Sequence, residues 1–162
     1  MLSNEMVSQL NEQVKHELYS AQYYLAMAAY CAAEDLDGFA HFFVMQAEEE
    51  RAHGMKLFKF LTDLGERVEI TGLDAPQTEY ASITEVFELA LKHEQFVSKL
   101  IYALMDRAHE EKAHAAMSFL QWFVDEQVEE EASMSKILNK VKRAGDDGYA
   151  ILFLDQEMAT RK

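Results

Sequence analysis

Several features are scarce in this 162-residue chain, and their scarcity limits what it can be. The single cysteine, Cys31, excludes an internal disulfide and any metal site built from four cysteines, and it suits a reducing compartment. The longest apolar run, residues 23–33, is too short to span a bilayer. Residues 1–5 lack the basic and apolar regions of a signal peptide. We therefore expect a cytoplasmic protein without a membrane partner.

Basic residues are also few. The chain has 15 Lys and Arg against 29 Asp and Glu, which gives a net charge of −14. Such a chain repels phosphates, so nucleic acid is not an expected partner. Metal cations are natural counterparts of so many carboxylates, although on composition alone a solvated acidic surface is the simpler interpretation. With 49% apolar residues the chain suits one folded domain over residues 1–162.

Apolar residues at helical spacing predict four long helices. We place the first at about residues 4–33 and the second at about 39–64, ending at Gly65. No glycine or proline follows between Ile83 and Arg143, but one helix there would be about 90 Å long, so we expect a break near 109–112. Residues 65–81, with the only proline, are long enough to cross the whole bundle.

The predicted fold is therefore all-α: a four-helix bundle over residues 4–143, with a long crossover between helices two and three. A short fifth helix is expected at about 147–159. Within it, residues 149–154 are apolar on nearly every face, so they need burial from more than one side. Other subunits are one source of that burial, and the chain's own bundle is the alternative.

Each long helix carries polar side chains inside its apolar stripe. Residues at i and i+3 share one helix face, so two of the interruptions are pairs that point inward together. The interrupting residues of the first two helices and those of the last two are related by a shift of 77 positions, and Lys15-His16-Glu17 recurs as Lys92-His93-Glu94. The sequence therefore indicates a duplicated helix pair. The interrupting residues are Glu17, the pair Glu50 and His53, Glu94, and the pair Gln127 and Glu130.

Burying four unpaired carboxylates would cost more than the roughly 5–15 kcal/mol that stabilises an ordinary domain. The carboxylates must then be protonated, paired with bases or bound to metal. No Lys or Arg falls on these stripes. Protonated carboxyl pairs remain an alternative, but two divalent cations would cancel the four charges. Oxygen ligands with one imidazole suit Fe or Mn, whereas Zn would bind without redox chemistry.

Local motifs extend this interpretation to the whole chain. Residues 11–13 (Asn-Glu-Gln), 17–20 (Glu-Leu-Tyr-Ser), 92–95 (Lys-His-Glu-Gln) and 119–122 (Phe-Leu-Gln-Trp) match the pattern of the bacterial non-haem ferritins, and the chain resembles that family over essentially its full length. The resemblance implies a ferritin-like bundle, twenty-four copies of which form a hollow cage. It also implies oxidation of Fe(II) by O2 or H2O2 and storage of an Fe(III) oxide mineral.

The resemblance also assigns roles to residues. It implies a ferroxidase centre of two irons with a third iron beside them, and a tyrosine that donates an electron during oxygen reduction. The implied ligands are Glu17, Glu50 and His53 for the first iron, Glu94 and Glu130 for the second with Glu50 bridging, Gln127 beside the centre, and Glu49, Glu126 and Glu129 with a shared Glu130 for the third; the tyrosine is Tyr24.

Some positions depart from relatives of this family. Bacterioferritins carry a haem-ligating methionine where this chain has Arg51, so no haem is predicted. Animal ferritins line an iron channel with carboxylates where this chain has Met117 and Leu120, so the sequence does not indicate by which route iron enters the protein. Two other functions also stay open: a passive iron store without turnover, and a metal-free helical interaction protein with protonated carboxylates.

Overall fold

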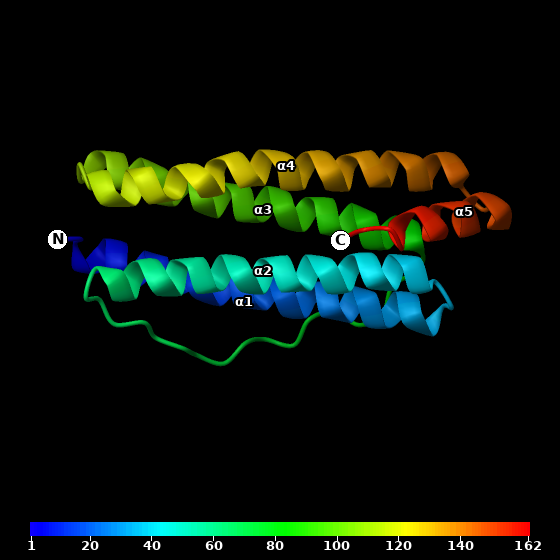
Figure 1. Cartoon of the computed structure of the whole chain (residues 1–162), viewed down its shortest axis with the longest axis horizontal. Coiled ribbons are helices and arrows are strands. Elements are labelled where there is room, and N and C mark those ends of the chain that lie inside the picture. The colour runs from blue at the N-terminus through cyan, green and yellow to red at the C-terminus, as the bar shows by residue number, and fades with distance from the viewer.

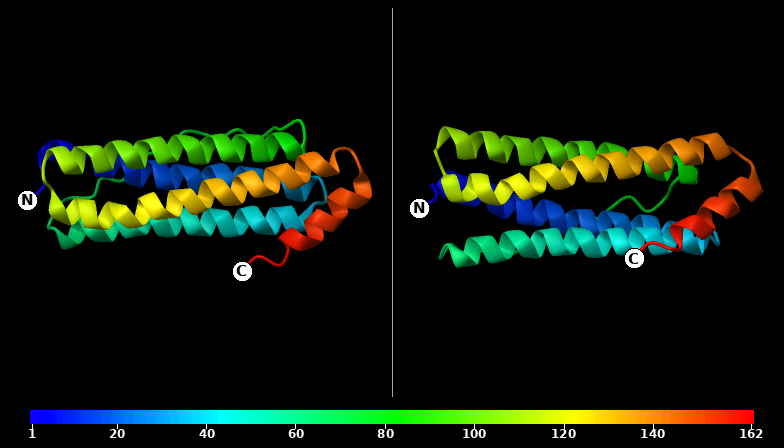
Figure 2. Two further views of the ribbon diagram at one scale, coloured as in Figure 1. Left: turned by 90° about the horizontal axis from the view of Figure 1, so that it is seen from above. Right: turned by 45° about the horizontal axis from the view of Figure 1, so that its top comes forward.

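The structure, a computed structural model, describes all 162 residues and contains five α-helices and no strand (Figure 1). Four long helices lie side by side in a bundle, and a short fifth helix crosses one end of it (Figure 2). This is the predicted ferritin-like architecture. No helix is long and apolar enough to cross a membrane. The helices are α1 (Asn4–Ala33), α2 (Asp37–Asp63), α3 (Ile83–Glu110), α4 (His114–Ala144) and α5 (Gly148–Met158).

Helix ends follow local capping chemistry. Ser3 caps α1 by accepting a hydrogen bond from the Met6 amide at 3.0 Å. At the end of α2, Gly65 adopts φ +77° and lets the Glu66 amide donate to the Leu61 carbonyl at 2.9 Å, which closes the helix in a Schellman motif. Ser82 accepts from the Glu85 amide at the start of α3. These three ends lie where the sequence predicts them.

The turn between α3 and α4 forms without glycine. Lys112 adopts φ +54°, and the Ala113 amide donates to the Ala108 carbonyl at 2.8 Å. The break lies in the predicted region, but a lysine takes the left-handed conformation that usually favours glycine. A similar residue, Asp35 with φ +59°, ends α1. The start of α2 differs from the prediction, because Asp37 and Gly38 already belong to the helix.

The long crossover determines how the two helix pairs are joined. Residues 66–82 run along the outside of the α1–α2 pair from one end of the bundle to the other, so that α2 and α3 run parallel (Figure 1). Asn11 on α1 holds the start of this segment, because its side chain donates to the Arg67 carbonyl at 3.1 Å and accepts from the Glu69 amide at 2.8 Å. The two helix pairs, α1 with α2 and α3 with α4, make the most extensive contacts.

The apolar core is divided into two clusters. One contains 17 buried residues around Phe43 and Phe87, and the other contains 12 around Leu57 and Phe123. The residues between these clusters along each helix are the polar interruptions found in the sequence. Leu25 and Leu64 continue the apolar spacing of the first and second helices in the sequence but are 43% and 41% exposed, so the buried stripe is narrower than the periodicity indicates.

Helix α5 packs on its own bundle and still leaves apolar surface exposed. It contacts α2 and α4, and the Phe39 amide donates to the Asp155 side chain at 2.9 Å. Gly38 makes this approach possible, since a Cβ atom there would lie 1.7 Å from the Asp155 carbonyl oxygen. Tyr149 and Phe153, however, are 89% and 69% exposed. The chain's own bundle therefore buries part of the segment, and burial by other subunits stays a prediction for the rest.

Candidate metal centre

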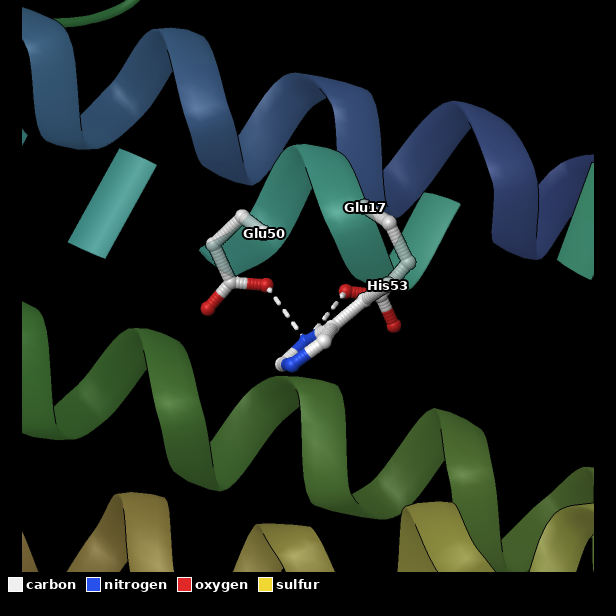
Figure 3. A group of neighbouring side chains, drawn as sticks. All are labelled: Glu17, Glu50 and His53. Atoms are coloured by element: carbon white, nitrogen blue, oxygen red, sulfur yellow. Dashed lines mark ion pairs between the residues drawn. The ribbon is translucent and has the colours of Figure 1, made fainter. Parts of the chain in front are cut away.

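The buried polar residues between the two apolar clusters form one layer across the bundle, which we call the buried layer. Three potential metal ligands from α1 and α2 converge in it. Glu50 and His53 project from one face of α2, as their i, i+3 spacing predicts, and Glu17 reaches them from α1 (Figure 3). His53 Nδ1 lies 3.3 Å from Oε2 of Glu50 and 3.7 Å from Oε2 of Glu17. All three side chains are nearly completely buried. One nitrogen and two carboxylates thus face a common point.

A second group of ligands adjoins the first. Carboxylate oxygens of Glu50, Glu94 and Glu130 lie within 4.8 Å of one another, and all three residues are buried. Glu94 comes from α3 and Glu130 from α4, so all four long helices contribute. Glu50 belongs to both groups and so links them. The structure therefore brings the predicted carboxylates and His53 into one buried layer.

Amide side chains hold these carboxylates in place. Gln127, a predicted site residue, donates to Glu94 Oε2 at 3.2 Å and to Ser98 Oγ at 3.1 Å. Gln46 donates to Glu130 at 2.7 Å, and Gln13 donates to Glu17 at 2.9 Å. Sequence reasoning missed the last two glutamines. The indication was present, because each stands four residues before a predicted ligand of its own helix and so shares its face.

Tyr24 also belongs to the layer. It lies seven residues after Glu17 on the same face of α1, and its hydroxyl donates to Oε1 of Glu94. Burial, followed by the negative charge of Glu94, raises the pKa of Tyr24 well above its ordinary value. Tyr24 therefore stays protonated and remains a hydrogen-bond donor to that carboxylate.

Burial dominates the electrostatics of the layer. It raises the pKa of Glu50 well above the ordinary range and that of Glu130 to about 8, in both cases with help from the negative charge of Glu94. Burial lowers the pKa of His53, but contacts with Glu17 and Glu50 outweigh this and raise it to about 11. Burial likewise opposes ionisation of Glu17, but the contact with His53 lowers its pKa. Without a metal, His53 is thus protonated and is the one positive charge among the carboxyl groups of the layer.

One buried acceptor of the layer is unsatisfied. Oε2 of Glu17 makes no hydrogen bond, although Nδ1 of His53 lies 3.7 Å away. Leaving a buried acceptor unsatisfied costs about 1–3 kcal/mol, and more when the group is charged. A cation between Glu17, Glu50 and His53 would satisfy this oxygen and replace the proton on His53. The donor set, oxygen atoms with a single imidazole, fits Fe or Mn better than a thiolate-preferring ion.

The acidic residues outside the layer line an adjoining cavity. Glu49, Glu126 and Glu129 face a space of about 370 Å³, with Glu130 shared between this cavity and the buried layer. His53 connects the two regions, because its Nε2 lies 3.8 Å from Oε1 of Glu126. Glu126 also joins His53 and Glu130 in a third group of potential ligands, whereas Glu49 and Glu129 join none. We call Glu49, Glu126 and Glu129 the outer acidic group.

Together, a four-helix bundle with one long crossover and a carboxylate-rich site between two apolar clusters define a ferritin-like carboxylate protein. The profile of the ferritin-like domain matches residues 7–144. The chain belongs to the ferritin family.

Relatives and solved structures agree with this assignment. The chain is 45% identical to the bacterial non-heme ferritin of Staphylococcus saprophyticus over 161 residues, which cover 99% of this chain and 96% of that protein. It is 44% identical to the bacterial non-heme ferritin of Staphylococcus aureus strain MRSA252, with 99% and 97% covered. An open pore ferritin from Archaeoglobus fulgidus superposes with a TM-score of 0.99 at 42% identity, with both chains covered completely.

Proposed function

We propose that this chain is an iron-storing ferritin subunit that oxidises Fe(II) in its buried polar layer and passes Fe(III) to a stored oxide mineral. The observation that carries the proposal is the convergence of Glu17, Glu50, Glu94 and Glu130 from four helices beside His53, at a point where one buried carboxylate oxygen makes no hydrogen bond. Fe(II) is the substrate in this scheme rather than a permanent cofactor. Two ions would cancel the four negative charges.

Each side chain has a defined part in this proposal. Glu17 and His53 hold the first ion, Glu94 and Glu130 hold the second, and Glu50 bridges them. A carboxylate bridge keeps two metals about 3.5–4 Å apart, so one O2 or H2O2 molecule can meet both. Each Fe(II) gives up one electron. O2 accepts the two electrons with two protons and leaves as H2O2, or H2O2 accepts them with two protons and leaves as two water molecules.

Two more side chains support this centre. Gln127 orients Glu94 through its amide, and the Tyr24 hydroxyl donates to the other oxygen of the same carboxylate. Donors of this kind fix the direction of a ligand's lone pairs. We also propose for Tyr24 the electron-donating role that the family resemblance implies, because its hydroxyl contacts Glu94, a proposed ligand of the centre. The outer acidic group, with Glu130, holds the third iron.

Assembly completes the proposed function. The exposed apolar side chains of α5, Tyr149, Leu152 and Phe153, need cover that the single chain does not provide. We propose that copies of the chain supply it in a cage of twenty-four subunits, in which the mineral is stored. We place this cage in the cytoplasm, in line with the reduced thiol of Cys31, which is buried.

An aerobic Fe(II) oxidation assay tests the proposal. We expect Glu17→Ala and Glu130→Ala to slow the initial rate at least about tenfold, because each removes a ligand. Glu48→Ala is the matched control, since Glu48 is an exposed carboxylate on α2 and should leave the rate unchanged. Equal rates in all four proteins would reject the assignment. Repeated Fe(II) additions separate this enzyme from a passive store, which would oxidise only the first.

A further inference from the structure

The C-terminal tail after α5 turns back onto α2, and Arg161 fixes it there. Nη2 of its guanidinium lies 2.9 Å from Oε2 of Glu49, and Nη1 donates to the Phe42 carbonyl at 3.2 Å. The guanidinium also covers the Phe42 ring at 4.4 Å. The carbonyl oxygen of Arg161 lies 2.6 Å from Nε2 of His41. Four contacts thus hold Arg161 against α2.

Arg161 is the only permanent cation that pairs with a proposed iron ligand. The remaining Lys and Arg ion pairs of the structure involve carboxylates outside the site. Lys140, which also lines the cavity, is bound at 2.5 Å to Glu157. The Arg161 side chain is 19% exposed, so its charge is largely removed from water and directed at Glu49.

This pairing conflicts with iron binding at the same carboxylate. A guanidinium group has five donors and no acceptor and stays charged at all ordinary pH values, so it cannot join a cation's ligand shell. An ion bound to Glu49 would also lie a few ångströms from the arginine's positive charge and be repelled by it. Iron and the guanidinium therefore compete for one carboxylate.

We propose that Arg161 is a tethered counter-ion of the outer acidic group, which an incoming Fe(II) ion must displace before it binds there. The inference rests on the function proposed above and deepens it. Arg161 touches no ligand of the buried pair, so it lowers the occupancy of the outer site alone. Its release would also free the tail from α2. The two inner positions would then fill first, and the outer site would fill only when Fe(II) is more abundant.

Anaerobic calorimetric titration of the assembled protein with Fe(II) tests this proposal without any turnover. Arg161→Gln should tighten the weaker, outer class of sites by about twofold to fivefold, the range expected for a partly exposed ion pair. The tighter, inner class should not change. Arg161→Lys keeps the charge and should restore binding close to the original affinity. Arg67→Gln removes the same charge at an exposed position far from the cavity and should bind Fe(II) as the unaltered protein does.

A second pair of variants shows whether the effect passes through Glu49. In a Glu49→Gln background, adding Arg161→Gln should change outer binding no further, because the partner is already gone. Outer affinity equal in Arg161→Gln and the unaltered protein would overturn the inference. So would an equal gain in Arg67→Gln, which would trace the effect to net charge. Absence of the inner class in the unaltered protein would instead reject the proposed function, so the two failures are distinguishable.

Discussion

Glutamine side chains, rather than charged ones, orient the carboxylates of the buried layer. Gln13, Gln46 and Gln127 each donate to a different glutamate and add no charge of their own. A lysine in their place would neutralise a ligand and weaken cation binding. An amide fixes the carboxylate while leaving its negative charge available to metal.

Gln46 provides a direct test at the residue scale. We expect Gln46→Met to lower the initial rate of Fe(II) oxidation by about tenfold, because Glu130 loses its 2.7 Å donor and rotates more freely. Gln22→Met is the control, since Gln22 is exposed on α1. Circular dichroism should show both variants to be fully helical. An unchanged rate in Gln46→Met would mean that packing alone positions Glu130.

Protonation of the same residues predicts how binding depends on pH. In the metal-free protein the pKa of Glu130 is about 8 and that of His53 about 11, so at pH 7 both carry protons that a bound cation must expel. Metal binding should therefore release protons, and affinity should rise with pH, more steeply below about pH 8 than above it, where only the His53 proton is still expelled. Anaerobic Fe(II) titrations in buffers of different ionisation enthalpy measure this release. Glu130→Gln should release fewer protons, and buffer-independent heats would contradict the prediction.

The sequence identifies the buried polar residues of this layer because each interrupts an apolar stripe at a countable position. Glu50 and His53 stand out for that reason alone. The supporting glutamines are harder to find, because Gln13 and Gln46 are uncharged and have no counterparts 77 residues later, where the chain has Ala90 and Phe123. The partner of Tyr24 is not predictable either. Spacing gives the face of α1 on which it lies, but not which carboxylate of another helix is closest.

At the scale of elements, helix ends with chemical caps are predictable, whereas the α3–α4 turn is located only by its polarity. Lys112 supplies the positive φ there, and no propensity singles out a lysine for that conformation. The position of α5 is also not encoded in its own periodicity. It depends on the absence of a side chain at Gly38, in another helix.

Gly38 therefore tests the docking of α5. A Cβ atom 1.7 Å from the Asp155 carbonyl oxygen cannot be accommodated without moving backbone, so Gly38→Ala should displace α5. We expect a loss of stability of about 1–3 kcal/mol, seen as a lower melting temperature in calorimetry. Gly72→Ala is the control, because a Cβ there would meet nothing within 4 Å. Equal melting temperatures would show that α5 is held elsewhere.

At the scale of the whole molecule, the exposed face of α5 predicts how copies associate. Phe153→Glu places a charge on an apolar side chain that is 69% exposed in the single chain, so it should convert the large assembly into smaller species. Size-exclusion chromatography with light scattering measures the change. Gln156→Glu adds the same charge at an exposed polar position of the same helix and should leave the assembly intact. If the Phe153→Glu protein still forms the full-size assembly, the subunit contacts lie on other surfaces.

The division of the core into two apolar clusters has a consequence for protein engineering. The buried layer between them adds little hydrophobic stabilisation, and apolar packing on either side keeps the bundle together. The residues proposed for the chemistry are thus different from the residues that stabilise the fold. A designer can exchange the proposed ligands of the layer for those that suit another metal and keep both flanking clusters, so the chain is a scaffold whose chemistry can be changed without redesigning its fold.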